Sequence, residues 1–345
     1  MVGFSAAASS QMALDSIVWQ RVPGGVEIKC YDFQSNEDFH QMWDASVHLD
    51  VTVFIKPHTI HRSYRSDMFS AATHVLDITI AAGLDYEVSH MSLSSYNGDI
   101  VSSESGLSFT AHEIQLYSSY GAIKGNWSLG ANMEIRTGRR VGNVSDDGID
   151  INLLPKRWSY GPQTRGTLLV NSWKGDIDIR MPFSQDSTSL RNMSISIQSE
   201  TGSIRGTYVT GVETTITTGG HGAINATLLP DFALPEKAYI TTSTAAGDTL
   251  LCILPPVIDH YYNINPLTNT RSDHSSGSGD LLLTYPSDWE GTALGLSVAG
   301  SVAVAGPEFD TIMAGDHVVV ARKGAGISSR LDFTTETGSG ELMVK

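Results

Sequence analysis

The segment Leu93-Ser94-Ser95-Tyr96-Asn97-Gly98-Asp99-Ile100 decides the fold, because its pattern returns along most of the chain. Residues before the turn alternate between apolar and polar, which is typical of a half-buried β-strand. Gly98 stands at a corner, where we expect a positive φ that glycine adopts without a Cβ clash. Ile100 then begins the next buried face. The segment therefore predicts a strand, a tight glycine corner and a second strand.

Copies of this turn recur with glycines 20 to 40 residues apart, and a period in this range is typical of a repeat architecture. The turn glycines of the clear copies are Gly98, Gly121, Gly175, Gly202, Gly222, Gly279 and Gly340, and those of the weaker copies are Gly142, Gly247 and Gly300. The repeat predicts an all-β chain folded as a parallel β-helix, or solenoid. Its inward ladder should contain Ile100, Ile123, Ile177, Ile204 and Ile224. Because Asn-Gly between alternating strands is also a hairpin signal, an antiparallel β-sandwich is the alternative.

Two copies of the repeat resemble an adhesin-like domain family of unknown function, whose members repeat a strand, Asn-Gly-Asp-Ile and another strand. These copies are Leu93 to Ile100 and Ile197-Gln198-Ser199-Glu200-Thr201-Gly202-Ser203-Ile204. The resemblance covers roughly residues 86–345. It implies a right-handed β-helix in a cell-surface or secreted setting, and it brings no catalytic residues. Several copies depart from the motif, with Ala122, Ala223 and Ser301 in place of the aspartate.

The chain is expected to divide into an N-terminal capping region, residues 1–85, and β-solenoid repeats over residues 86–345. In the first part, Ser35-Asn36-Glu37-Asp38 predicts the capped start of a short helix. Alternation from Val47 to Ile55 predicts a strand. We therefore expect an α+β cap that covers the apolar end of the stack. A loop outgrowth is expected at about residues 255–276.

The charge of the chain excludes one class of partner. Its 345 residues carry a formal net charge of -15, and a nucleic-acid-binding protein needs a clustered basic face.

No run approaches the ~18 consecutive apolar residues of a membrane-spanning helix, so no transmembrane segment is expected. We expect a monomer with charged residues, Glu341 and Lys345, guarding the open C-terminal end of the rod.

Three features of the sequence bear on the location of the protein. Residues 1–14 lack a basic region followed by a sustained apolar run, so no signal peptide is predicted. Four sequons would accept glycans if the chain is secreted, at Asn126, Asn143, Asn192 and Asn225. Together with the resemblance they favour an extracellular or cell-surface location, and a cytoplasmic scaffold is the alternative.

Neither a metal nor a cofactor is expected. His58 and His61 have ligand-like spacing only on a helix, which Pro57 disfavours. Acidic residues after the turn glycines, Asp99, Asp176, Asp248, Asp280 and Glu341, are expected to bind turn backbone rather than Ca²⁺. Cys30 and Cys252 are far apart, and two unrelated buried thiols are favoured over one long-range disulfide.

No nucleophile elbow, phosphate-binding loop or dinucleotide-binding motif is present in the sequence. We therefore expect a non-enzymatic protein of adhesion or scaffolding, whose partner is a cell-wall glycan or a surface protein. Aromatic residues could serve as platforms for sugar rings, namely Trp158, Tyr160, Tyr261 and Tyr262, with Trp173 and Trp289 as further candidates. The alternative is a carbohydrate-active β-helix enzyme, a polysaccharide lyase or hydrolase that uses paired carboxylates from neighbouring coils.

Overall fold

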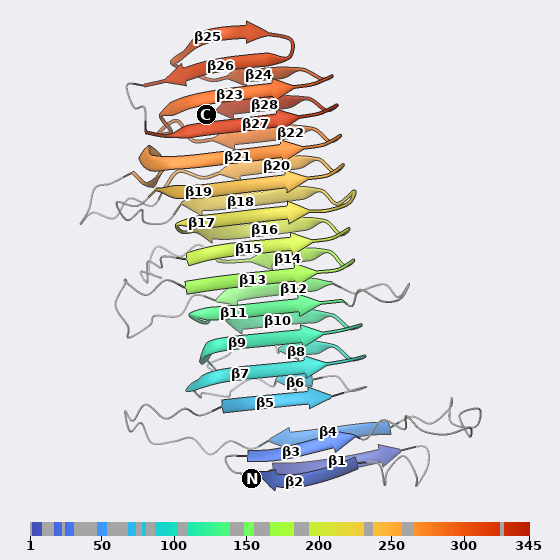
Figure 1. The fold of residues 1–345 in the computed structure, drawn as a ribbon. Coiled ribbons are helices and arrows are strands. Elements are labelled where there is room, and N and C mark those ends of the chain that lie inside the picture. Colours follow the sequence, from blue (N-terminus) through green and yellow to red (C-terminus); the bar gives the residue numbers. More distant parts are fainter. Residues whose placement is uncertain are drawn as a thin grey trace.

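The computed structural model describes residues 2–8, 17–22, 25–30, 47–53, 68–73, 78–80, 87–102, 110–138, 148–154, 166–182, 193–230, 237–256, 265–324 and 328–345. For the strands before residue 89 it describes only the backbone. Figure 1 shows a rod of stacked coils, with the N-terminus below the stack and the C-terminus beside β28, near the other end.

Within the described residues, two sheets form the faces of the rod, one of 13 strands and one of 11. The 13-stranded sheet, here the long sheet, contains β5 (Met68–Thr73), β7 (Glu87–Ser95), β9 (Thr110–Ser118), β11 (Asn132–Thr137), β13 (Gly166–Ser172), β15 (Met193–Ser199), β17 (Glu213–Thr218), β19 (Ala238–Thr244), β21 (Thr270–Ser276), β27 (Arg330–Thr335), β23 (Gly291–Ser297), β26 (Val318–Lys323) and β25 (Phe309–Gly315). The 11-stranded sheet, here the short sheet, contains β6 (Ile78–Ile80), β8 (Ile100–Ser102), β10 (Ile123–Ser128), β12 (Ile149–Leu154), β14 (Ile177–Arg180), β16 (Ile204–Thr210), β18 (Ile224–Pro230), β20 (Thr249–Ile253), β22 (Leu281–Tyr285), β28 (Gly340–Val344) and β24 (Val302–Ala305).

Each coil contributes one strand to each sheet, and neighbouring coils pair in parallel. For example, β13 pairs in parallel with β11 and β15, and β14 pairs in parallel with β12 and β16. A sandwich of hairpins would pair consecutive strands in antiparallel fashion. The predicted parallel β-solenoid is therefore confirmed, and the antiparallel β-sandwich is excluded as the architecture of the stack.

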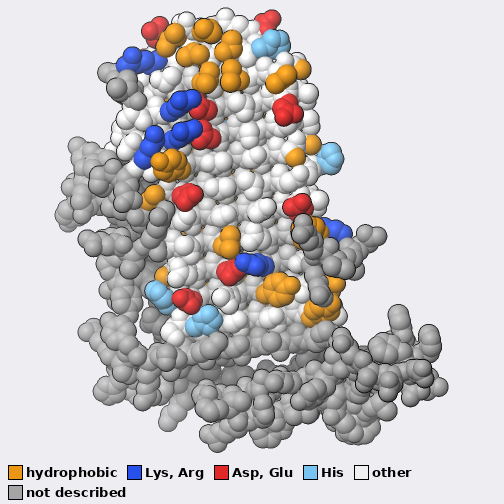
Figure 2. Space-filling view, in the orientation of Figure 1, with side chains coloured by type: hydrophobic (Ala, Val, Ile, Leu, Met, Phe, Trp, Pro, Cys, Tyr) orange, Lys and Arg blue, Asp and Glu red, His pale blue; other side chains and the backbone are white. Residues whose placement is uncertain are grey.

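The aliphatic ladder lies where the repeat predicts it. Successive coils place Ile100, Ile123, Ile149, Ile177, Ile204 and Ile224 at one register position of the short sheet. All six side chains are at most 2% exposed. The residue that follows each ladder member on its strand points outward, because successive strand residues face opposite sides of a sheet. Figure 2 shows the outer face of the long sheet, where hydrophobic and charged side chains are sparse except near the top of the rod.

A second inner ladder, made of hydroxyl side chains, runs along the corner where the long sheet ends. Its members occupy one register position on successive strands and are all buried: Ser95, Ser118, Thr137, Ser172, Ser199, Thr218, Thr244, Ser276, Thr335 and Ser297. The serines at 95 and 199 accept the N–H of the glycine three residues later, at 2.8 and 2.9 Å. Ser172 instead donates to the carbonyl of Gly175 at 2.8 Å. At these corners the ladder supplies hydrogen-bond partners to backbone groups that burial removes from water.

The corner glycines are required for a different reason than the sequence suggests. Corner glycines of successive coils stack in one column, which contains Gly121, Gly202, Gly222, Gly247, Gly279, Gly338 and Gly300. None of these glycines has a positive φ. A Cβ on Gly202 would instead lie 2.2 Å from the carbonyl oxygen of Gly175 in the preceding coil, and one on Gly222 would lie 2.1 Å from that of Gly202. The expectation of positive φ was wrong, because close stacking of the backbones excludes the side chain.

The acidic residue after the glycine ties one coil to the next. Oδ1 of Asp99 accepts the backbone N–H of Ala122 at 2.7 Å, and Oδ1 of Asp176 accepts that of Ser203 at 2.8 Å. Asp248 and Asp280 make the same contact with the following coil. The carboxylates thus bind turn backbone as predicted, although the turn belongs to the neighbouring coil.

The last coil of the chain lies out of order in the stack (Figure 1). After β23 and β24 the chain forms the antiparallel hairpin β25–β26, which pairs with β23. It then returns to insert β27 between β21 and β23, and β28 between β22 and β24. Gly338, rather than Gly340, stands in the glycine column, with its Cβ position 2.1 Å from the carbonyl oxygen of Gly279. Gly340 pairs with Leu281 in the aliphatic ladder.

The boundaries of the stack differ from those predicted. Strands β5 and β6 already belong to the two sheets, so the solenoid begins by residue 68 rather than 86. Before them, β1 (Val2–Ala8) pairs antiparallel with β4 (Val47–Val53), and β2 (Ile17–Val22) with β3 (Gly25–Cys30). The predicted strand after Val47 is confirmed as β4, while the predicted helix lies outside the described residues. A loop outgrowth was expected at about residues 255–276. Within this range the 3₁₀ turn Pro266–Asn269 and strand β21 belong to the stack instead.

Candidate functional site

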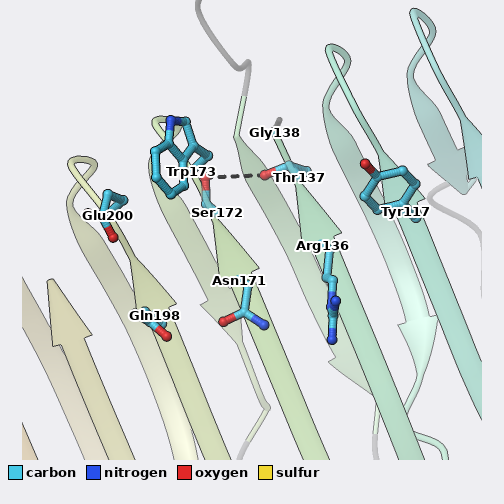
Figure 3. Close-up of a pocket in the computed structure, with 9 residues that line it drawn as sticks. All are labelled: Tyr117, Arg136, Thr137, Gly138, Asn171, Ser172, Trp173, Gln198 and Glu200. Atoms are coloured by element: carbon cyan, nitrogen blue, oxygen red, sulfur yellow. Dashed lines mark hydrogen bonds between the residues drawn. The ribbon is translucent and has the colours of Figure 1, made fainter. Parts of the chain in front are cut away.

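The outer face of the long sheet carries a groove of about 380 Å³ near the corner edge (Figure 3). It crosses four successive coils, from β9 to β15. Its lining residues are Tyr117, Arg136, Thr137, Gly138, Asn171, Ser172, Trp173, Gln198 and Glu200. All nine come from the last residues of strands or from the corners that follow them.

The floor of the groove is one row of outward side chains. Tyr117, Arg136, Asn171 and Gln198 share one register position on β9, β11, β13 and β15. Each of them directly precedes a member of the inner hydroxyl ladder. Because that ladder faces the core, the preceding residue must face solvent. The buried ladder therefore fixes the direction of the residues in the row.

One wall of the groove comes from the corners. The backbone N–H of Trp173 donates to the carbonyl of Thr137 at 3.1 Å, and that of Glu200 donates to the carbonyl of Ser172 at 3.0 Å. Beneath them, the hydroxyl of Thr137 donates to Oγ of Ser172 at 3.2 Å (Figure 3). These bonds hold the corners of neighbouring coils in line, so the half-buried side chains of Trp173 and Glu200 flank the row.

The groove combines hydrogen-bonding groups with aromatic surface. The guanidinium of Arg136 forms an ion pair with Glu134 on the same strand, and the side chains of the two are 52% and 33% exposed. A guanidinium has five N–H donors, so one carboxylate does not exhaust them. Asn171 and Gln198 each offer a carboxamide with two donors and an acceptor. Tyr117 is 37% exposed, and its ring and that of Trp173 add apolar faces with a polar edge.

This set of groups suits one kind of ligand. Sugar rings present hydroxyls that pair with planar polar side chains, and C–H faces that stack on aromatic rings. A phosphate or nucleic acid would instead need a cluster of basic groups, whereas Glu134 and Glu200 accompany Arg136 here. The groove therefore contains the types of group that pair with sugar hydroxyls and stack on sugar rings.

Of the aromatic residues predicted as ligand platforms, only Trp173 and Trp289 lie among the described residues. Trp158, Tyr160, Tyr261 and Tyr262 lie outside the described residues. Trp173 lines the groove. In contrast, Trp289 is 0% exposed and packs edge-on against Tyr285 with ring centroids 5.8 Å apart. Trp289 is thus a core residue, and its proposed role as a ligand platform was wrong.

Sequence reasoning missed Tyr117, Arg136, Asn171 and Gln198. A usable signal was present, because each stands immediately before the Ser or Thr that precedes a corner. Aligning the copies on that hydroxyl residue, instead of on the glycine alone, would have placed the four side chains in one row.

The described sequons occupy the outer face of the short sheet. Asn225 is exposed on β18. Asn126 on β10 is half-buried, and its Oδ1 accepts a hydrogen bond from Nδ2 of Asn152 at 2.8 Å. Because Asn225 is exposed whereas Asn126 is half-buried, Asn225 is the better glycan acceptor of the two. Asn143 and Asn192 lie outside the described residues.

No group of three or more histidine, cysteine, aspartate or glutamate side chains among the described residues could hold a metal ion. His90 pairs with Glu113 at 3.0 Å, and His58 and His61 lie outside the described residues. Glu341 is exposed on the outer face of β28 rather than in the column of turn carboxylates. Cys252 has a free, half-buried thiol on β20, whereas the side chain of Cys30 is not among those described.

Two pairs of carboxylates on neighbouring strands, Asp150 with Asp178 and Asp273 with Asp332, form ion pairs with arginines. Arg180 bonds Asp150 at 3.0 Å and Asp178 at 2.8 Å, and these contacts raise the pKa of its guanidinium. Asp273 and Asp332 pair with Arg271 and Arg330 at 2.9 and 2.8 Å. The oxygens of these four carboxylates are engaged in ion pairs on the outer faces of the sheets.

No family model, curated protein or solved structure matches the chain. Within the described residues, no helix is long and apolar enough to cross a bilayer.

Proposed function

We propose that this β-solenoid is a non-enzymatic binding module that holds a glycan in the groove of the long sheet. The observation that carries the proposal is the union of two aromatic rings, Tyr117 and Trp173, with the polar side chains of Arg136, Asn171 and Gln198. Four coils of a rigid stack present these groups, so the protein orders little on binding. Preorganisation of this kind lowers the entropic cost of association.

A role in adhesion or scaffolding, outside the cell or at its surface, follows from the same proposal. The target would be a cell-wall glycan or a glycosylated surface protein. Two features support this setting: the few hydrophobic side chains on the middle of the long-sheet face (Figure 2) and the exposed sequon at Asn225. The resemblance to adhesin-like repeats favours the same setting.

A glycan array with the full chain tests the proposal. Replacing Tyr117 with alanine should weaken binding by about tenfold, because a stacked aromatic ring contributes ~1 kcal/mol or more beyond its buried area. The matched control is Tyr239→Ala. Tyr239 is 44% exposed on the same face, but it lies on β19 outside the groove.

Two outcomes would overturn the proposal. If no glycan binds, or if both tyrosine variants bind like the unmodified chain, the groove is not a glycan site. Incubation with pectin-like and β-glucan polymers tests the enzymatic alternative. Release of shorter chains that stops when a carboxylate pair is replaced would establish a lyase or hydrolase instead.

A further inference from the structure

The groove has a direction, which restricts the shape of its ligand. Its floor takes one side chain from each of four successive coils, at the same position of each strand. Neighbouring strands are ~4.8 Å apart, so the four side chains span roughly 14 Å along the rod. The row therefore runs across the strands, parallel to the axis of the stack.

We infer that the ligand is a linear, uncharged polysaccharide with β-1,4 linkages, lying along the rod axis across β9 to β15. This inference rests on the proposed function and names the substrate class of the same groove. In a β-1,4-linked chain each ring advances by a length close to the ~4.8 Å strand spacing. Successive rings can therefore lie over successive coils, with alternate rings turned to present opposite edges. A flat ribbon of rings also matches a flat sheet better than a coiled β-1,3 chain does.

The charge of the site selects an uncharged chain. Arg136 is already paired with Glu134, and Glu200 adds a second carboxylate to the groove. The whole protein carries a formal charge of -15. A polyuronate would meet repulsion both in the groove and at long range. Hydroxyl groups of a neutral sugar, in contrast, can donate to the carboxylates and accept from the guanidinium and carboxamides.

The row also sets a length. Before Tyr117 the same position is Ser94 on β7, and after Gln198 it is Thr217 on β17. These short side chains offer neither a long polar arm nor an aromatic face. The groove floor thus ends after four coils, which corresponds to about four rings at one ring per ~4.8 Å strand spacing.

Calorimetric titration of the full chain with β-1,4-linked glucose and N-acetylglucosamine oligomers of two to six rings tests the inference. Affinity should rise by about tenfold or more from two to four rings in one of these series and then level off. Asn171→Ala should weaken four-ring binding about fivefold, since a hydrogen bond contributes ~1 kcal/mol. The control Ser275→Ala, in the same row on β21 but outside the groove, should leave binding unchanged.

Failure of the inference differs from failure of the proposed function. Equal affinity for two-ring and six-ring oligomers, or tighter binding of polygalacturonate or of β-1,3-linked oligomers, would overturn the extended neutral ligand but leave glycan binding intact. Absence of binding to every sugar on the array would overturn both.

Discussion

At the scale of the residue, the corner glycines carry the stacking of the coils. Gly202→Ala would place a methyl group 2.2 Å from the carbonyl oxygen of Gly175. Neighbouring coils would have to separate, and overpacking of this kind costs about 1–3 kcal/mol. Urea denaturation should show this loss. The control is Gly315→Ala, because a Cβ there meets its nearest neighbour at 3.8 Å. If both variants unfold at the same urea concentration, backbone contact does not explain the glycine column.

Among the residues that the structure describes, His274 is a buried residue whose charge depends on pH. Its Nδ1 lies 2.8 Å from Oγ1 of Thr242 and its Nε2 lies 3.0 Å from the hydroxyl of Tyr285, and it is 2% exposed. Burial lowers the pKa of His274 to about 4, against a smaller opposing effect of Asp273. A neutral imidazole donates from one nitrogen and accepts at the other, so the hydroxyls of Thr242 and Tyr285 satisfy both ring nitrogens.

The sign of the pH effect follows from this pKa. The unfolded chain binds a proton at His274 near pH 6.5, while the folded chain does so only near pH 4. Stability from this residue is therefore complete above pH 6.5 and is lost as the pH falls toward 4. Between pH 7 and 4.5 the loss should be about 2 kcal/mol. His274→Gln should lose less stability than the unmodified chain over the same interval. Equal losses in the two proteins would show that His274 does not titrate in this way.

At the scale of the element, two strands share a device that places an aromatic ring in the core. Strands β10 and β16 begin Ile-Lys-Gly-Asn-Trp and Ile-Arg-Gly-Thr-Tyr. Nε1 of Trp127 donates to the carbonyl of Lys124 at 3.1 Å, and the hydroxyl of Tyr208 donates to that of Arg205 at 2.9 Å. A Cβ on Gly206 would lie 2.9 Å from the hydroxyl of Tyr208. The stronger constraints on these glycines are their positive φ and a carbonyl oxygen of the preceding coil, 2.1 Å from a Cβ on Gly125 and 2.0 Å from one on Gly206.

The strands and corners of the repeat are the features that the sequence predicts best. The period-2 alternation before each corner and the aliphatic residue after it depend only on local chemistry, so both sheets and the ladder from Ile100 to Ile224 were predictable. The reason for the glycines was not, because the carbonyl that excludes a side chain belongs to another coil. The groove was missed for a similar reason. Arg136 and Asn171 are neighbours only once the register of β11 and β13 is known.

The order of the coils is a property of the whole molecule, and the repeat alone could not give it. The long gap before the last copy signals an insertion, which the structure identifies as β25 and β26. Spacing along the chain does not say beside which coil the last strands pack. As a result, Glu341 and Lys345 were assigned to an open end, whereas β28 pairs with both β22 and β24.

The edge of the long sheet at this end is β25 instead. Exposed apolar side chains gather near it at the top of the rod in Figure 2, including Ile312 and Met313 at 61% and 53% exposure. Two features oppose pairing with another chain. Asp310 is exposed on the strand, and a register shift lies between Thr311 and Met313. Charges and bulges on an edge strand are common protection against edge-to-edge association.

Light scattering at high protein concentration distinguishes β28 from β25 as the strand through which two molecules could associate. Glu341→Val with Lys345→Val should remain monomeric, because an inserted strand has no free edge to offer. Asp310→Val with Thr311→Val should associate, since it removes the charge of β25 and extends its apolar run to Val-Val-Ile-Met. Association of the first variant, with the second remaining monomeric, would mean that β28 leaves its place between β22 and β24 in solution. The rod would then end in an open coil, and its last strands would be the surface that other chains meet.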